Sequence, residues 1–463
     1  MLTLMTSSMR RHRLFAARPA SRDPRRAVRS AAVLFVVIGV LLGSWASVIP
    51  AVSARVQADH AQLGLALLGM AIGALAGMQL GGRWSSRWGP GRASVIGVAL
   101  ASLAVALPGS AGSLMSLCIA LFLFGAAAGG ANVAVNALGV ELQRSSERPL
   151  MSVLHAGFSF GGLAGALLGG LATGVLPTSV HLVLIGGLGL AATYAERVTL
   201  VALTAKANVP DPLPESGERV GPALDVRPLV LVLGVAAACT AVAEGAVSDW
   251  GSLHLRETLG SSPTMAAMGF AAFSLAMGSA RLAGRSLVIR FGDTPVLVCG
   301  AALGTAGMLI AALAPTPSIA LLGFLLAGLG VANVFPLAIA RAGLLDGTRG
   351  VARASTVGYT GLLGGPPVIG LLADAWGLRG ALLAVAILVL SVAGLAVAVE
   401  ARLQGGSSVA EALRRQTRAR LRALTRAGER SLRSHADSLR VLVEQSARST
   451  VGGPRPISDT FPF

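Results

Sequence analysis

The chain has 463 residues, of which 54% are hydrophobic and only 13% are charged, with a formal net charge of +17. Soluble domains usually carry about 25% charged residues, so this composition excludes both an ordinary soluble core and a disordered chain. A strongly basic balance is also typical of nucleic-acid binding. The positions of the cations therefore decide between that class and a membrane protein.

Long apolar runs predict membrane-spanning helices, each of which needs about 20 apolar residues. The strands of a transmembrane barrel would instead appear as ~10-residue segments of alternating hydrophobicity. The sequence thus predicts an all-α membrane protein with twelve spans, at 31–52, 62–82, 93–110, 113–138, 149–172, 180–202, 228–251, 264–283, 294–314, 317–341, 351–374 and 379–400.

The cations indicate the orientation. If the N-terminus lies inside, 35 of the 38 Lys and Arg residues fall in inner segments, which leaves Arg55, Arg256 and Arg379 outside. This distribution fits the positive-inside rule and predicts a plasma-membrane protein with both termini cytoplasmic. The charge is thereby explained without a nucleic-acid partner.

Five segments are expected, and the longest inner loop, which is rich in Pro, divides the spans into two sets of six. In the C-terminal tail, Leu residues recur at roughly helical spacing among many Arg residues, which favours contact with the anionic inner leaflet over a plain solvated tail. The segments are a basic N-terminal tail (1–30), a first bundle (31–202), a middle loop (203–227), a second bundle (228–401) and a basic C-terminal tail (402–463).

The two halves share short matches. Asn132 and Asn333 each lie in an Ala-Asn-Val triplet, 201 residues apart, and the Arg-x-Gly sequences ending at Gly89 and Gly292 are 203 apart. Matches at nearly one offset indicate duplicated halves, as in many secondary transporters.

The stretch from Gly82 to Arg92 resembles the loop motif G-x-x-x-D-[RK]-x-G of the major facilitator superfamily, with Ser86 at the acidic position. In the second half that position is Ile289, so an acid-based gate latch is not expected. The resemblance implies twelve helices in two pseudo-symmetric six-helix bundles and a gating role for Arg87, Gly89, Arg92, Arg290 and Gly292.

Finer features resemble the fucose-permease-like, YbjJ-like bacterial branch of that superfamily, which favours sugar-like or other polar solutes. They are Trp45 to Pro50, Asn132-x-x-x-Asn136 ending in Glu141, His155 with Ser159 to Gly162, Glu244-Gly245 with Asp249-Trp250, and Tyr359 ahead of Gly365-Pro366-Pro367.

Two ionisable residues are candidates for proton coupling, because ionisable groups inside a bilayer are costly and are often functional. Glu244 lies well beyond the midpoint of its predicted span (228–251), which places it in the outer half of the membrane. His155 is the one His clearly inside a hydrophobic span, and an ordinary His titrates near neutral pH. The alternative for each is a neutral group held by a hydrogen bond to a helix.

Other polar residues are candidates for contact with a substrate. Asn132 and Asn136 share one helix face, where they bind either a solute or a neighbouring helix. Trp250 is either a stacking surface or an interface anchor. The predicted substrate contacts are Asn132, Asn136, Trp45, Tyr359, Trp250 and Asn333.

The sequence also predicts the surroundings of two carboxylates and of one proline pair. Glu141 is expected to pair with Arg144, Arg148 or an arginine of another loop, as a gate or latch. Asp249 is about 140° around an α-helix from Glu244, so the two carboxylates should not share one pocket wall. The Pro366-Pro367 pair is expected to interrupt its helix.

Glycines recur every four residues in two spans, at Gly69, Gly73, Gly77 and Gly81 and again at Gly161, Gly165 and Gly169. Such small-residue faces predict close helix packing.

Catalytic motifs are missing from the sequence. It contains no phosphate-binding G-x-x-x-x-G-K-[ST] loop and no metal-binding Cys/His cluster, so we expect no enzyme activity, no cofactor and no metal. The predicted function is secondary active transport of a small organic solute, coupled to protons, by alternating access. The alternative is a non-transporting membrane sensor whose basic tail signals to a partner.

Overall fold

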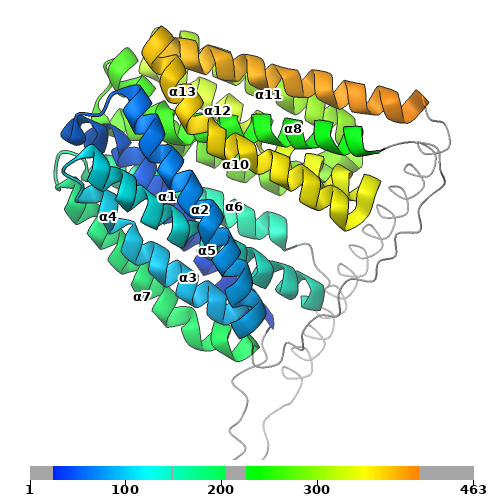
Figure 1. Cartoon of the computed structure of the whole chain (residues 1–463), viewed down its shortest axis with the longest axis horizontal. Helices are drawn as coiled ribbons and strands as arrows, with labels where there is room; N and C mark the ends of the chain where they lie inside the picture. Colours follow the sequence, from blue (N-terminus) through cyan, green and yellow to red (C-terminus); the bar gives the residue numbers. More distant parts are fainter. Residues whose placement is uncertain (1–23, 147–149, 205–225, 406–463) are drawn as a thin grey trace, which may run out of the picture. The chain divides into compact units, whose positions relative to one another are not determined.

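The computed structural model describes residues 24–146, 150–204 and 226–405, and nearly all of them are helical (Figure 1). The first half contains α1 (Pro24–Val56), α2 (His60–Trp88), α3 (Pro90–Ala104), α4 (Ala106–Gly109), α5 (Leu114–Ser146), α6 (Met151–Ala172) and α7 (Thr178–Thr204). The second half contains α8 (Arg227–Gly245), η2 (Ala246–Trp250), α9 (Gly251–Leu253), η3 (His254–Thr258), α10 (Pro263–Phe291), α11 (Asp293–Leu313), α12 (Pro317–Val331) and α13 (Val334–Gly405).

Eleven helical segments of the described residues are long and apolar enough to cross a membrane. This confirms the prediction of an all-α, multi-pass membrane protein. The sequence predicted twelve spans, and the difference lies in Arg349–Leu403, a single segment of 55 residues. Gly377, with φ 71° and ψ 167°, is non-helical inside that segment. The two spans predicted there, 351–374 and 379–400, therefore meet at a glycine turn.

The recurring glycines form close helix contacts, as predicted. A Cβ atom added to Gly73 or Gly77 on α2 would lie 2.1 Å or 1.9 Å from a carbonyl oxygen of α5. On α6, a Cβ atom at Gly161 or Gly165 would lie 2.3 Å or 2.2 Å from a carbonyl oxygen of α1. Real Cβ atoms do not approach so closely, so these two helix pairs depend on glycine for their backbone contact.

The two halves turn in the same way at corresponding junctions. Gly89, between α2 and α3, has φ 83° and ψ 152°, while Gly292, between α10 and α11, has φ 85° and ψ 169°. Each glycine donates its backbone N–H to the last turn of the preceding helix, at Ser85 or Val288. Because side chains strain a backbone at positive φ, glycine is favoured at both positions. The shared geometry supports duplication of the halves.

The predicted seventh span is longer than expected. Two π-helical turns, η2 and η3, carry the helical path on to Thr258, so the whole segment covers Arg227–Thr258. Glu244 then lies close to the middle of this segment rather than near its outer end. The prediction that Glu244 lies in the outer half was based on a span that ended at residue 251, and it stays a prediction.

The second half is interrupted at a different place from the one predicted. The prediction that Pro366 and Pro367 interrupt their helix was wrong, because α13 runs through both residues without non-helical backbone angles at either. The tenth span is interrupted instead at Ala332–Asn333, between α12 and α13. Pro336 lies four residues after Ala332 and has no backbone N–H to donate to that carbonyl group.

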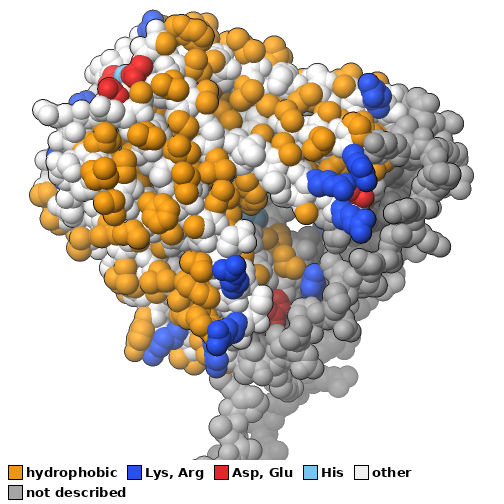
Figure 2. Space-filling model, viewed as in Figure 1, with side chains coloured by type: hydrophobic (Ala, Val, Ile, Leu, Met, Phe, Trp, Pro, Cys, Tyr) orange, Lys and Arg blue, Asp and Glu red, His pale blue; other side chains and the backbone are white. Residues whose placement is uncertain are grey.

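The helix ends define two ends of the helical region. The arginine end contains the α2–α3 and α10–α11 junctions with Arg87, Arg92 and Arg290, and the histidine end contains His60 and the η3–α10 connection. Helix α10 packs against α6 and α1, and so joins the halves. Figure 2 shows Arg side chains on both sides of a recess in the surface, while hydrophobic side chains spread over much of the remaining face.

Candidate functional site

An arginine of α10 links the halves near the middle of the helical region. The guanidinium of Arg281 donates a hydrogen bond to the hydroxyl of Ser159 on α6, at 3.0 Å. The same guanidinium lies 3.7 Å from a carboxylate oxygen of Glu244 on α8. Three helices from both halves therefore meet at one largely buried cation, and we call Arg281, Ser159 and Glu244 the central polar cluster.

The depth of Arg281 was not predicted. The residue lies ten positions before the end of α10 at Phe291, which is about 15 Å at 1.5 Å per residue. Counting it among the inner-loop cations was wrong, because the helix continues for more than two turns beyond it. Its side chain is 16% exposed, whereas that of Glu244 is 38% exposed. Since Arg281 contacts the other half, Glu244 faces the space between the halves.

His155 lies one helical turn from the central polar cluster. Its backbone carbonyl accepts a hydrogen bond from the Ser159 hydroxyl at 3.2 Å, and its ring meets Phe35 of α1 edge-on at 5.4 Å. The two predicted coupling residues are therefore connected through Ser159 and Arg281. His155 is not the only histidine within a span, because His181 on α7 and His254 on η3 are buried in helices as well.

The asparagine candidates separate into two environments. Asn136 donates to both the backbone oxygen and the side-chain oxygen of Asn132, each at 2.8 Å, so these two residues bind one another along α5. Asn333 instead donates across helices to the carbonyl of Ala280, at 3.1 Å. Ala280 immediately precedes Arg281, so Asn333 holds α10 in place next to the central polar cluster.

The aromatic candidates differ in burial. Trp45 is 2% exposed and Trp250 is fully buried, and neither indole nitrogen has a hydrogen-bond partner among the described residues. Trp250 does not lie at the surface, so the interface-anchor interpretation was wrong. Tyr359 is half-buried and packs against Phe335, with 6.2 Å between the ring centroids.

Two further carboxylates, Asp249 and Glu141, have surroundings that bear on their predicted roles. Asp249 lies in η2 and accepts a hydrogen bond from Ser248 at 3.0 Å. Because π-helical hydrogen bonds join residues five apart, the angular separation from Glu244 that an α-helix would give does not hold there. Among the described residues Glu141 makes no ion pair, with Arg144 or any other partner, and Arg148 lies outside the described residues.

The predicted gating residues lie at the arginine end. Arg87 and Arg92 are exposed, and Arg290 is also exposed and lies over the ring of Phe291 at 5.3 Å. Ser86, which replaces the acid of the family motif, donates its hydroxyl to the carbonyl of Gly82. The position is therefore occupied by a locally satisfied side chain that carries no charge.

Ion pairs at the arginine end stay within one half. Arg341 binds Glu400 at 2.8 Å and Thr294 at 2.9 Å, and Arg353 binds Asp346 at 2.7 Å. Among the described residues, these pairs link helices of the second half to one another. They do not join that half to the first.

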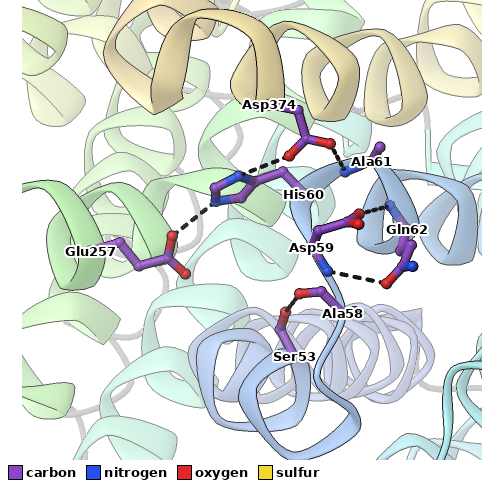
Figure 3. A network of polar contacts seen from close by, with 8 residues as sticks. All are labelled: Ser53, Ala58, Asp59, His60, Ala61, Gln62, Glu257 and Asp374. Carbon is purple, nitrogen blue, oxygen red and sulfur yellow. Dashed lines mark hydrogen bonds and ion pairs between the residues drawn. The ribbon is translucent and has the colours of Figure 1, made fainter.

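Sequence analysis missed a cluster that joins the halves at the histidine end (Figure 3). His60, the first residue of α2, lies between Glu257 of η3, with its Nε2 2.8 Å from a carboxylate oxygen, and Asp374 of α13, with its Nδ1 at 3.2 Å. The signal was available, because acidic residues are rare in this chain and both acids fall in or near predicted outer loops. Only the cations of those loops were considered.

No group of three or more metal-binding side chains occurs among the described residues. The described side chains that contact Arg281 are instead a hydroxyl group and a carboxylate. Such an arrangement fits recognition of a polar organic molecule, because the guanidinium has five N–H donors and two neighbouring groups do not use them all.

The chain is similar in sequence to a known family and to several known proteins. A family model described as Major Facilitator Superfamily matches residues 31–246 and 233–437. An uncharacterised MFS-type transporter of Yersinia pestis is 34% identical over 375 residues, covering 80% of this chain and 95% of that protein. The membrane protein MosC of Rhizobium meliloti is 31% identical over 364 residues, covering 77% of this chain and 86% of MosC.

Solved structures share the fold. The structure of a D-xylose–proton symporter has a TM-score of 0.65 at 15% identity and covers 80% of this chain and 97% of its own. The structure of the nucleoside transporter NupG has a TM-score of 0.62 at 12% identity, with 81% and 98% covered.

Proposed function

The chain belongs to the major facilitator superfamily of membrane transporters, and from this premise we propose that it carries a small polar organic solute by proton-coupled alternating access. The solute binds between the two halves at the central polar cluster. His155, Asn132 and Asn136 line the path on the first-half side, with Tyr359 on the second-half side. The substrates named for the structural neighbours belong to those proteins, and the proposal rests on the residues of this chain.

One observation supports this proposal most strongly. Arg281, deep in α10, is held by Ser159 from the first half and by Glu244 from the second. A charge inside a bilayer is costly, and charged side chains there commonly mark a substrate or ion pathway. Because the Glu244 contact is a single one at 3.7 Å, a solute carboxylate or hydroxyl group can bind the remaining guanidinium donors. Our proposal is thus a solute with hydrogen-bond acceptors, in line with the resemblance to the fucose-permease-like branch.

Coupling is proposed to use Glu244 and His155, the two titratable residues beside Arg281. A proton that neutralises Glu244 frees the guanidinium for a solute acceptor, whereas the ionised carboxylate competes with the solute. Binding of the solute and of the proton then support each other, which is the condition for symport.

The proposed orientation has both termini in the cytoplasm, the arginine end inside and the histidine end outside, following the positive-inside rule. The gating residues Arg87, Arg92, Arg290 and Glu141 then lie on the cytoplasmic side. The proposed lipid contact of the C-terminal tail concerns residues 406–463, which lie outside the described residues, as do most of the tail 1–30 and of the loop 203–227.

The test is uptake into proteoliposomes under an imposed pH gradient, with a panel of sugars, polyols, small carboxylates and nucleosides. We expect uptake of at least one class to follow the gradient and to stop when the gradient is collapsed. Arg281→Gln should lower the initial rate at least about tenfold, a loss of about 1.4 kcal/mol of solute or transition-state binding. Arg353→Gln, which breaks an ion pair of the same kind away from the central polar cluster, is the matched control and should retain the rate.

Two outcomes would contradict the proposal. If a solute from the panel moves at the same rate with and without the pH gradient, proton coupling is wrong. If Arg281→Gln and Arg353→Gln transport equally well, the central polar cluster is not the solute site.

A further inference from the structure

We propose that His60, Glu257 and Asp374 form a proton-binding site that closes the histidine end of the transporter when a proton is bound. This inference rests on the proposed proton coupling, because it names a place where a proton binds and what that proton does. The three side chains come from α2, η3 and α13, so both halves contribute to the site. Figure 3 shows the imidazole ring between the two carboxylates.

The two contacts of the ring with carboxylates favour an added proton on the imidazole. Both ring nitrogens of His60 face carboxylate oxygens, at 2.8 Å for Nε2 and 3.2 Å for Nδ1. A neutral imidazole has one N–H donor and one acceptor nitrogen, and ionised carboxylates only accept. One of the two contacts would then set lone pair against lone pair. With one added proton, both nitrogens donate and the ring becomes a cation between two anions.

The proton balance follows directly. With the site closed, one proton is bound as the second N–H of the imidazolium, and both acids are ionised. Loss of that proton to water leaves a neutral ring, which can donate to only one acid. Either Glu257 then loses its bond to α2, or Asp374 keeps only its bond from the Ala61 N–H, and the link between the halves is weakened.

Backbone contacts between α2 and α13 support the contact of His60 with Asp374. The N–H of Ala61 donates to the second carboxylate oxygen of Asp374 at 3.1 Å, so α13 is held by the first turn of α2 as well as by the ring. A Cβ atom on Gly370 would lie 2.6 Å from the carbonyl oxygen of His60, and one on Gly64 would lie 2.9 Å from that of Pro366. Helices α2 and α13 therefore touch through their backbones just below the site.

The start of α2 fixes the ring in place. Asp59 caps the helix by accepting the N–H of Gln62 at 2.7 Å, and the Gln62 side chain accepts the N–H of Asp59 at 3.2 Å. This reciprocal capping box holds the first turn, so the position of His60 does not depend on the acids alone. Trp250 lies close to the imidazole, at 6.1 Å between ring centroids.

Other charged groups near the histidine end are directed elsewhere. Arg55 of α1 donates to the carbonyl of Gly109, Arg256 of η3 donates to that of Ser261, and the nearby charge of Arg379 on α13 acts on His254. On its own element the neighbouring acid is Asp59, which is used for capping. The charged groups that face the imidazole are thus Glu257 and Asp374. The His60 side chain is 27% exposed, so protons can reach it from water.

A distance measurement tests the site without any solute. Met115, at the start of α5, and Leu313, at the end of α11, are 70% and 61% exposed and lie at the histidine end of opposite halves. Spin labels are attached to Met115→Cys and Leu313→Cys in full-length protein in lipid nanodiscs, with Cys118, Cys239 and Cys299 replaced by Ala. Distances are measured at about pH 5.5 and about pH 8.5, on either side of the ordinary histidine value of about 6.5.

We expect a short label distance at the lower pH and at least about a fivefold larger population of a longer distance at the higher pH. His60→Gln should show the longer distance at both pH values, because it cannot donate to both acids with a charge. His60→Arg, which stays charged throughout, should show the short distance at both. These two variants move the equilibrium in opposite directions, so a general loss of folding cannot imitate both.

The matched control is Asp59→Asn, which removes a neighbouring acid that does not contact the imidazole and leaves a good helix cap. It should keep the pH response of the parent protein. The inference is overturned if the parent distances do not change with pH, or if His60→Gln responds to pH as the parent does.

Failure of this inference can be told apart from failure of the proposed function. If the distances do not depend on pH while uptake remains coupled to protons, the coupling proton binds elsewhere and the triad has no part in it. If the distances respond to pH as expected while no solute of the panel moves with protons, the proton-dependent closure at His60 is supported and the proposed coupled transport is wrong.

Discussion

The Arg281 guanidinium donates to the Ser159 hydroxyl at 3.0 Å, although the two residues are 122 positions apart and lie in different halves. This bond places the buried cation between the halves, where relative motion of the halves must break or remake it. Ser159 also donates to the carbonyl of His155. A shift of α10 that moves the Ser159 hydroxyl therefore also changes this hydrogen bond, one turn along α6.

Coupling between Arg281 and Glu244 is expected in a double-mutant cycle of stability. Arg281→Gln and Glu244→Gln each leave one charge without its partner, and the double variant removes both charges. Because Glu244 is 38% exposed and the contact is 3.7 Å, we expect a coupling energy of only about 1 kcal/mol. Thermal unfolding of the four proteins in detergent measures it, and strictly additive effects would exclude the pair.

Two neighbouring glycines of α7 should respond in opposite ways to alanine. A Cβ atom on Gly186 would lie 2.3 Å from the carbonyl oxygen of Ser102 on α3, whereas one on Gly187 would meet nothing within 4 Å. Gly186→Ala should therefore lower stability by about 1–3 kcal/mol. Gly187→Ala should be neutral or raise stability by up to about 1 kcal/mol, because alanine favours the helix. Equal effects in thermal unfolding would contradict the close approach of α3 and α7.

Backbone contact between α2 and α13 predicts a steric opening of the histidine end. Gly370→Ala brings a methyl group against the carbonyl of His60, so the label distance between the halves should lengthen even at about pH 5.5. Gly364→Ala on the same helix meets nothing within 4 Å and serves as the control. A short distance in Gly370→Ala would show that the helices can separate enough to admit a methyl group without opening the gate.

The proposed orientation predicts opposite labelling of two exposed positions. In a background with Cys118, Cys239 and Cys299 replaced by Ala, a membrane-impermeant thiol reagent should label Ala54→Cys on intact cells. Ser86→Cys, at the arginine end, should react only after the membrane is permeabilised, because arginine-rich ends stay inside. The reverse pattern would place the termini outside.

The sequence predicted the helical fold well because each membrane-spanning helix depends mainly on the residues of its own segment. An apolar run of about 20 residues forms a span whatever surrounds it, since its backbone groups must bond internally. The glycine repeats at Gly73 and Gly77 and the turns at Gly89 and Gly292 were also readable, because each depends on what a Cβ atom does at one position. Local rules failed at η2 and η3, where a polar stretch stays helical through packing: His254 and Leu255 are fully buried.

The candidate site was only partly predictable. Glu244, His155 and the asparagines were found because polar residues in apolar runs are conspicuous, but Arg281 was taken for a loop cation and His60 was overlooked. Both residues are functional candidates because of partners that lie far away in sequence. Arg281 contacts Ser159. His60 contacts Glu257 and Asp374. No spacing rule along one helix brings such residues together.

By itself, the sequence determined that the chain is a helical, multi-pass membrane protein built from two related halves, because hydrophobicity and glycine spacing act within single helices. Only the tertiary structure decided which of the few polar side chains meet. Arg281 meets Glu244 and Ser159, and His60 meets two acids, because the packing of α10 on α6 and of α2 on α13 sets those distances. A charged side chain inside a bilayer has a high free-energy cost. The proposed chemistry therefore depends on these side-chain contacts and not on the net charge of +17.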